Sequence, residues 1–265
     1  MGKGTISLAT WVNEQQSRGQ YAFTRAEAQA ALSKQAPTLT KAIQRLCASG
    51  RIERVCRGFY AIVPLEYKGA GGVPAEWYLS KLMKVRRLPF YVGLLTAAAW
   101  HGAGHQQPQE LHVVTVKQTR KVKTKRTRIS FFVSRQLPHG LTEDRRTQTG
   151  DVPVSTPAWT ALDLLRFQSR LGGFDSITPV LAELAENIRI KDLLDASVRE
   201  QDRSLVRRLG WLLSALGFDE KVKPLLRALQ KERPIKVLLD PAKPPRGRYD
   251  SLWCVVKNAE LILEP

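Results

Sequence analysis

The stretch PTLTKAIQRLCASGRIERVCRGFYAIV (Pro37–Val63) decides the fold of the N-terminal part of the chain, because it changes from one periodicity to another. Leu39, Ile43 and Leu46 recur at helical spacing, and Pro37 suits an early helical position, so the pattern predicts a helix that ends near Gly50. Beyond Gly50 the apolar residues indicate two short strands around a tight turn at Arg57-Gly58.

Two further helices are predicted upstream of this stretch. Residues 6–16 carry apolar side chains at helical spacing and end at Gly19. Thr24 is an N-cap candidate, and Glu27 stands three residues later, which is the capping-box pattern at the start of an alanine-rich second helix. Three helices followed by a β-hairpin predict a winged helix-turn-helix.

The third helix and the hairpin carry the side chains that suit DNA. A recognition helix enters the major groove with its N-terminal residues nearest the bases, while longer cations reach phosphates. Thr38 and Lys41 are the candidates for base contact, and Arg45 suits either role. The full set of predicted DNA-binding residues is Lys34, Thr38, Thr40, Lys41, Gln44, Arg45, Arg51, Arg54 and Arg57. A protein interface on a helical hairpin is the alternative interpretation.

The remainder of the chain predicts a larger, mixed domain. Helices are expected at about 75–86, 93–101 and 157–167 and throughout 174–231, with strands at 111–116, 129–133 and 152–155 and at the C-terminal end. The fold class is therefore α+β, with an N-terminal winged helix-turn-helix and a mixed α/β, helix-rich C-terminal domain. We expect the DNA-binding domain at 1–66, a Gly-rich linker at 67–74 and the C-terminal domain at 75–265.

Charge indicates the class of partner. The chain has 265 residues and a net charge of +18, and residues 1–149 carry +16 of it, which favours a polyanion. Its apolar stretches are shorter than a membrane span, and no signal region follows the N-terminus, so we expect a cytoplasmic protein without a membrane partner.

No pattern in the sequence indicates catalysis or a metal. A Ser-His-Asp set, paired carboxylates and a P-loop are not recognisable, and the glycines between His101 and His105 argue against a shared helical face for metal binding. We therefore expect no enzyme activity, no metal and no cofactor.

A second basic segment lies between two predicted strands. Residues 117–128 contain seven cations and no acid, which predicts an exposed hairpin or loop. It is either a solvated loop or an additional nucleic-acid contact through phosphates. The candidate residues are Lys117, Arg120, Lys121, Lys123, Lys125, Arg126 and Arg128.

Several segments resemble one known family in the same order along the chain. The segments 38–46 and 49–60 resemble the winged helix of the AbiEi-type antitoxins of the AbiE (type IV) toxin–antitoxin and phage-resistance systems. The segments that resemble the family's C-terminal region are 91–102, 112–115, 129–132, 154–163, 171–173 and 209–213. The resemblance covers almost the whole chain, although the basic run at 117–128 is heavier than the family pattern.

The resemblance implies a regulator with two roles. Antitoxins of this family bind repeats in their own promoter through the winged helix and repress the operon, often cooperatively. Their C-terminal domain counters a nucleotidyltransferase-type toxin without a stable complex. By this resemblance we expect a monomer in solution that binds double-stranded DNA cooperatively, and the toxin-neutralising residues are not identifiable from the sequence.

Two other functions remain open at this point. The C-terminal half could carry a nuclease active site targeted to DNA by the winged helix. Alternatively, it could bind the toxin directly as an adaptor. Metal-dependent plasmid cleavage would favour the first, and co-purification with the toxin the second.

Overall fold

The computed structural model describes residues 6–32, 36–104 and 109–261. Their contacts divide the chain into two compact units. Unit 1 comprises residues 1–91, 109–137 and 144–153, and unit 2 comprises residues 92–108, 138–143 and 154–265. Unit 1 thus joins the N-terminal module to segments that are distant in sequence.

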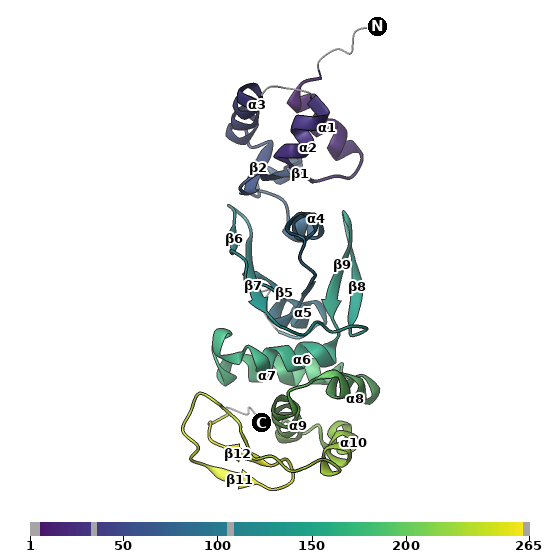
Figure 1. Ribbon diagram of the computed structural model, residues 1–265, viewed down its shortest axis with the longest axis vertical. Helices are drawn as coiled ribbons and strands as arrows, with labels where there is room; N and C mark the ends of the chain where they lie inside the picture. The colour runs from purple at the N-terminus through teal and green to yellow at the C-terminus, as the bar shows by residue number, and fades with distance from the viewer. Residues whose placement is uncertain (1–5, 33–35, 105–108, 262–265) are drawn as a thin grey trace. The chain divides into compact units, whose positions relative to one another are not determined.

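The first part of unit 1 is a winged helix. Its elements are α1 (Leu8–Ser17), β1 (Ala22–Thr24), α2 (Arg25–Leu32), α3 (Ala36–Ala48), β2 (Ile52–Cys56) and β3 (Phe59–Ile62). The strands form an antiparallel sheet in the order β1-β3-β2, and the three helices gather at this sheet (Figure 1). The predicted helices and hairpin are confirmed, whereas the three-residue strand β1 was not predicted.

The start of α2 is fixed by the predicted capping box. The Thr24 N–H donates to Glu27 Oε2 at 2.6 Å, and the Glu27 N–H donates to Thr24 Oγ1 at 3.1 Å. The Glu27 carboxylate also pairs with Lys81 of α4 (Glu76–Arg86) at 3.0 Å. One carboxylate therefore caps α2 and ties it to α4.

Aromatic packing also joins α4 to the winged helix. Trp77 lies between Tyr21 and Tyr67, with ring centroids 4.7 and 4.9 Å apart. Tyr67 belongs to the short 3-10 helix η1 (Leu65–Tyr67), so the segment after the winged helix packs back onto it. Edge-to-face ring pairs of this kind add to the free energy gained from burial.

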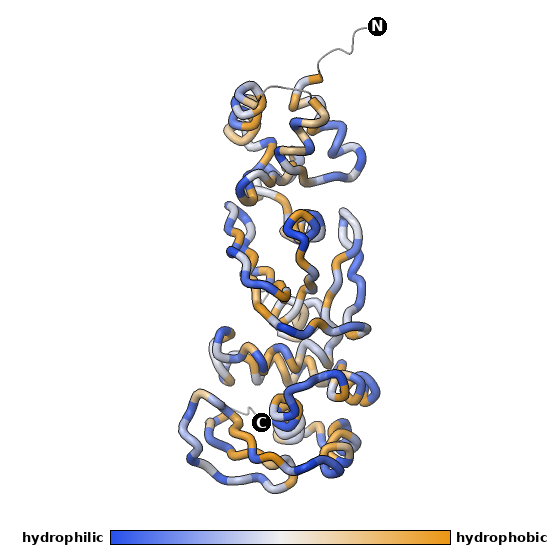
Figure 2. Tube along the Cα trace, in the orientation of Figure 1, coloured by the Kyte–Doolittle hydropathy of each residue, from blue (hydrophilic) through white to orange (hydrophobic). Residues whose placement is uncertain are grey.

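A six-stranded sheet follows, in the order β6-β7-β5-β4-β9-β8. Its strands are β4 (Phe90–Val92), β5 (Leu111–Thr115), β6 (Val122–Lys123), β7 (Arg128–Val133), β8 (Thr142–Thr147) and β9 (Gly150–Ser155). β5 pairs with β7 in parallel, and β6 pairs with β7 antiparallel. Figure 2 shows hydrophobic stretches in β5 and β7 and a hydrophilic segment around β6. The short strand β4 and the polar strand β8 were not predicted.

Helices make up most of unit 2. They are α5 (Leu94–Trp100), α6 (Pro157–Arg166), the 3-10 helix η2 (Gln168–Arg170), α7 (Phe174–Glu186), α8 (Ile190–Arg199), α9 (Arg203–Ala215) and α10 (Asp219–Gln230). α6 begins at Pro157, as predicted, and the Thr156 hydroxyl accepts from the Trp159 N–H. Residues 158–165 are all buried, so α6 is the central helix of this unit.

The chain ends in a small sheet of order β10-β12-β11. The strands are β10 (Val237–Leu238), β11 (Arg248–Asp250) and β12 (Val255–Lys257). β10 runs parallel to β12, and β11 runs antiparallel to it. With these elements the predicted α+β fold class is confirmed.

Candidate nucleic-acid interface

Helix α3 has one buried face and one polar, exposed face. Leu39 and Ile43 are buried in the core formed by the three helices and the small sheet. The residues on the polar face are exposed: Thr38, Lys41, Gln44 and Arg45. Lys41, Gln44 and Arg45 form no side-chain hydrogen bond or ion pair with any other described residue, so their donors are available to a ligand.

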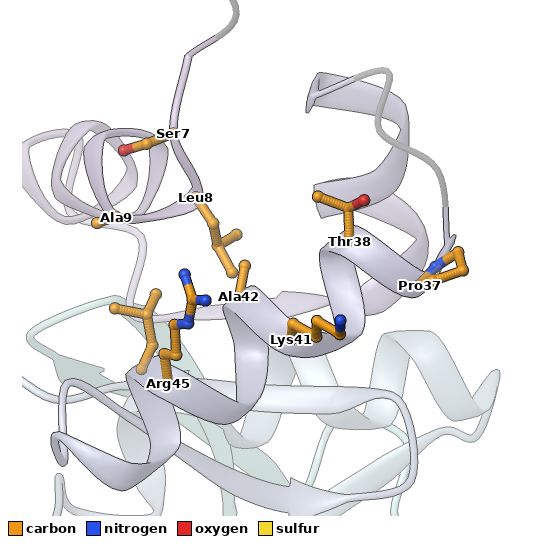
Figure 3. Close-up of a pocket in the computed structure, with 9 residues that line it drawn as sticks. Ser7, Leu8, Ala9, Pro37, Thr38, Lys41, Ala42 and Arg45 are labelled. Atoms are coloured by element: carbon orange, nitrogen blue, oxygen red, sulfur yellow. The ribbon is translucent and has the colours of Figure 1, made fainter.

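A groove of about 390 Å³ runs between the start of α1 and the polar face of α3. Ser7, Leu8 and Ala9 line one side, and residues of α3 line the other (Figure 3). In Figure 3 the Arg45 side chain turns toward α1 beside Leu8, whereas Lys41 lies farther toward the start of α3. The groove is therefore open and has cations along one wall.

Thr40 lies on the other side of α3, where its hydroxyl is engaged. Thr40 Oγ1 donates to the Ala36 carbonyl at 2.8 Å and accepts from Arg25 Nη2 at 2.8 Å. Arg25 Nη2 also reaches the Ala36 carbonyl at 3.2 Å. Thr40 and Arg25 thus hold the first turns of α2 and α3 together. Lys34, which was predicted as a contact, lies outside the described residues.

The wing is a tight hairpin with exposed arginines. Gly58 adopts a φ of +75°, a conformation that costs glycine least, and its carbonyl accepts from the Arg25 N–H at 2.8 Å. The turn is thereby fixed against the start of α2. Arg57 in the turn and Arg54 in β2 are both exposed.

Arg51 occupies a different environment from the other predicted arginines. Its Nη1 donates to the Val63 carbonyl at 2.5 Å, and its Nη2 donates to Asn13 Oδ1 at 2.9 Å and to Gln16 Oε1. The guanidinium therefore joins α1 to the end of β3. This arrangement positions the module and leaves fewer of its donors for a ligand.

The basic segment 117–128 forms the hairpin of β6 and β7. Its turn is closed by the Thr124 N–H, which donates to the Thr127 carbonyl at 2.9 Å, and Tyr78 Oη lies 2.7 Å from Thr127 Oγ1. Burial raises the pKa of Tyr78, so this hydroxyl stays protonated. All seven cations are exposed: Lys117, Arg120, Lys121, Lys123, Lys125, Arg126 and Arg128. We call this segment the basic hairpin.

The tip of the basic hairpin is attached to the winged helix. The Lys125 N–H donates to Glu53 Oε1 of β2 at 2.9 Å, and Arg126 Nη1 donates to the Gly72 carbonyl at 3.0 Å. The Arg126 guanidinium also lies 5.6 Å from the centre of the Tyr67 ring. The hairpin therefore belongs to the same body as α3 and the wing.

A second groove, of about 500 Å³, runs between the end of α3, β2 and the tip of the basic hairpin. Arg54, Lys68 and Lys125 all line it. Sequence reasoning missed Lys68 because it stands in the Gly-rich segment that we expected to be a linker. Lys68 reaches the groove because this segment packs back onto β2, and no local sequence pattern indicates that packing.

His101 ends α5 and is engaged within unit 2. Its Nε2 lies 2.7 Å from the Ser155 carbonyl oxygen. His105 lies outside the described residues. Within the described ranges, no three His, Cys, Asp or Glu side chains gather as metal ligands do, and no helix has the length and apolar character of a membrane span.

Two family models match the sequence. The AbiEi antitoxin C-terminal domain matches residues 91–215, and the family described as transcriptional regulator, AbiEi antitoxin, matches residues 14–63. The two matches follow each other in the order that the resemblance predicted. Together they cover most of the winged helix and a large part of the remainder. No curated protein matches the sequence.

The fold is similar to that of a protein whose structure has been solved. The crystal structure of the RV2827C protein from Mycobacterium tuberculosis superposes with a TM-score of 0.65 at 15% sequence identity. The similarity covers 94% of this chain and 90% of that protein. The shared fold thus includes both the winged helix and the C-terminal region.

Proposed function

Because the chain belongs to the AbiEi antitoxin family and is an antitoxin and transcriptional regulator, we propose that it represses its own operon by binding promoter repeats through α3 and the wing. The C-terminal region counters a nucleotidyltransferase-type toxin. The protein acts by binding and not by catalysis.

The polar face of α3 is the observation that carries this proposal. Thr38 and Lys41 stand in the first half of the helix, where a recognition helix meets base edges, and Arg45 follows one turn later. Their side chains are exposed while Leu39 and Ile43 hold the opposite face in the core. Thr38 and Lys41 read bases, and Gln44 and Arg45 contact bases or the adjoining phosphates.

Phosphate contacts come from the wing and the basic hairpin. Arg54 and Arg57 are exposed on the wing, and the hairpin tip is attached to β2, so both can meet one duplex. Each neutralised phosphate steepens the salt dependence of binding, with a slope of about −0.9 in log K per contact. Arg51 and Thr40 support this surface by positioning α1, α2 and α3.

Binding to the operon's own upstream repeats tests the DNA part. We expect these repeats to bind more tightly than a scrambled duplex of the same length and composition. Lys41→Ala should reduce that preference, whereas Arg57→Ala should weaken binding to both duplexes equally and lower the salt slope by about 0.9. Equal affinity of the wild-type protein for both duplexes would exclude sequence-specific repression.

Co-expression tests the antitoxin part. The chain should restore growth to cells that express the nucleotidyltransferase-like protein of the same operon, without co-purifying with it. Stable co-purification would favour the adaptor mechanism instead. Incubation with plasmid and Mg²⁺ addresses the nuclease alternative, because cleavage that depends on the metal would overturn the non-enzymatic assignment.

A further inference from the structure

Unit 2 carries a second basic surface, which the near-neutral charge of residues 150–265 conceals. Two exposed loops, residues 231–236 and 241–247, lead into β10 and β11. The strands β11 and β12 lie side by side in the last part of the chain, drawn in yellow (Figure 1). The exposed cations of these loops and of β11 are Lys231, Arg233, Lys236, Lys243, Arg246 and Arg248. We call this set the C-terminal basic patch.

The acids of the same segment are turned to other partners. Glu232 makes two hydrogen bonds to Arg203, at 2.6 and 3.1 Å. Asp240 is buried and accepts from Gln168 Nε2, and Asp250 accepts from Trp211 Nε1 at 3.2 Å. The hydrogen-bond partners of these three carboxylates, Gln168, Arg203 and Trp211, are therefore side chains outside the patch.

The cations themselves lack such partners. Lys243, Arg246 and Arg248 form no side-chain hydrogen bond or ion pair with the residues that the structure describes. A structural network would pair them with carboxylates, as it does for Arg203. Three unpaired cations within six residues form a surface that attracts polyanions.

The backbone beneath these cations is fixed in advance. Asn258 Nδ2 donates to the carbonyls of Asp240, Lys243 and Pro244 at 2.8, 3.2 and 3.1 Å. Gly247 passes so close to β12 that a Cβ there would lie 2.1 Å from the Lys257 carbonyl oxygen. A loop that is already ordered loses less conformational entropy on binding.

An exposed aromatic ring stands within the patch. Tyr249 of β11 is 47% exposed, and Lys236 Nζ lies 5.8 Å from its ring centre, so the loop 231–236 contacts β11. A hydrogen bond with the Cys254 side chain raises the pKa of Tyr249, so the ring stays neutral. Cations beside an exposed ring are the pairing that proteins use for unpaired nucleotides, with phosphates on the cations and a base on the ring.

We propose that the C-terminal basic patch is a second nucleic-acid-binding surface that takes a single-stranded segment, with Lys243, Arg246 and Arg248 on its phosphates and an unpaired base stacked on Tyr249. This surface is independent of the recognition of duplex DNA by α3. It gives the C-terminal region of the antitoxin a nucleic-acid ligand of its own.

Fluorescence anisotropy with labelled oligouridine and oligothymidine of about 12 nucleotides tests the proposal on the full chain. The triple variant Lys243→Ala, Arg246→Ala, Arg248→Ala should lower the salt slope by about 2, since each single-strand contact contributes about 0.7. Tyr249→Ala should weaken binding roughly 5- to 150-fold, and Tyr249→Phe should retain it because the ring remains. A preference for one oligomer identifies RNA or DNA as the ligand.

Two controls separate this surface from general charge and from α3. The triple variant Lys191→Ala, Lys223→Ala, Arg227→Ala removes the same charge from exposed positions on α8 and α10, and it should bind the oligomers like the wild type. The double variant Lys41→Ala, Arg45→Ala should lose binding to the operator duplex and keep binding to the oligomers.

Three outcomes would overturn the inference. The first is equal oligomer affinity in the patch variant and the wild type, and the second is an equal loss in the α8 and α10 control. The third is binding of the wild type to vesicles with phosphatidylserine but not to the oligomers, which would assign the patch to a membrane surface.

Discussion

Replacement of Arg51 by alanine should destabilise the winged helix without removing a DNA contact. The side chain spans α1 and the end of β3 through three hydrogen bonds, to the Val63 carbonyl, Asn13 and Gln16. Hydrogen bonds from a charged donor contribute about 1.5–3 kcal/mol each, and water replaces part of this where the groups are exposed. We therefore expect a loss of about 2–4 kcal/mol in the free energy of unfolding.

Calorimetry measures this loss directly. For a domain of the size of unit 1, which contains the winged helix, a loss of about 2–4 kcal/mol corresponds to a fall of roughly 5–15 °C in the Tm of its transition. Arg54→Ala is the matched control, because it removes the same residue type three positions later, where the side chain is exposed, and it should leave the Tm unchanged. At a temperature where both variants are folded, Arg51→Ala should bind the operator with wild-type affinity, whereas Arg54→Ala should bind less tightly.

The opposite pattern would refute this reasoning. If Arg51→Ala melted with the wild type while its affinity and salt slope fell as in Arg54→Ala, the guanidinium would be a phosphate contact. The hydrogen bonds to α1 would then add nothing measurable to stability. Both quantities come from the same two protein samples.

Three further predictions concern other parts of the chain. Burial raises the pKa of Glu27, but the hydrogen bonds from Thr24 and the ion pair with Lys81 of α4 lower it by more, so the net pKa is below 4.5. The stability that the ionised carboxylate contributes is therefore present above pH 4.5 and is lost as the pH falls through the folded pKa. Glu27→Gln should make the stability less dependent on pH in this range, which acid unfolding curves would show. Glu53→Ala should free the tip of the basic hairpin and weaken operator binding severalfold without a change in base preference, which anisotropy on wild-type and scrambled duplexes would detect. Gly210→Ala should destabilise unit 2 by about 1–3 kcal/mol or more, because its Cβ would lie 2.1 Å from the Trp253 ring, and a second calorimetric transition should move while operator binding stays intact.

Local patterns in the sequence predicted the winged helix well. The apolar stripe of α3, the capping box at Thr24 and the turn at Gly58 are each decided within a few residues, and each is found as predicted. The short strands were missed because their pairing depends on residues far along the chain. β1 pairs with residues of β3 that lie 35 to 39 positions later, and three residues carry too little periodicity to indicate a strand.

The sequence predicted which residue types make up the candidate interface, but it did not predict which of these side chains are held by hydrogen bonds within the protein and which are exposed. Arg51, Arg54 and Arg57 look alike in the sequence, yet only Arg51 meets acceptors from α1. The return of the Gly-rich segment onto β2, which brings Lys68 beside Arg54, depends on tertiary packing. The net charge summed over residues 150–265 also concealed the C-terminal basic patch, because that sum includes acids that are buried or paired with other side chains.

The number of cations is thus a weaker guide to function than the number of hydrogen-bond acceptors that the protein itself places around each cation. Arg126 gives one donor to the Gly72 carbonyl and remains exposed, so it can both hold the hairpin tip and face a phosphate. Arg51 has its donors distributed over three protein acceptors and serves the fold. Because a phosphate contact releases counterions and an internal hydrogen bond does not, the salt slope of each single variant separates the two roles where affinity alone does not. The sum of the slopes lost on the wing and on the basic hairpin then measures how many of their cations meet the duplex.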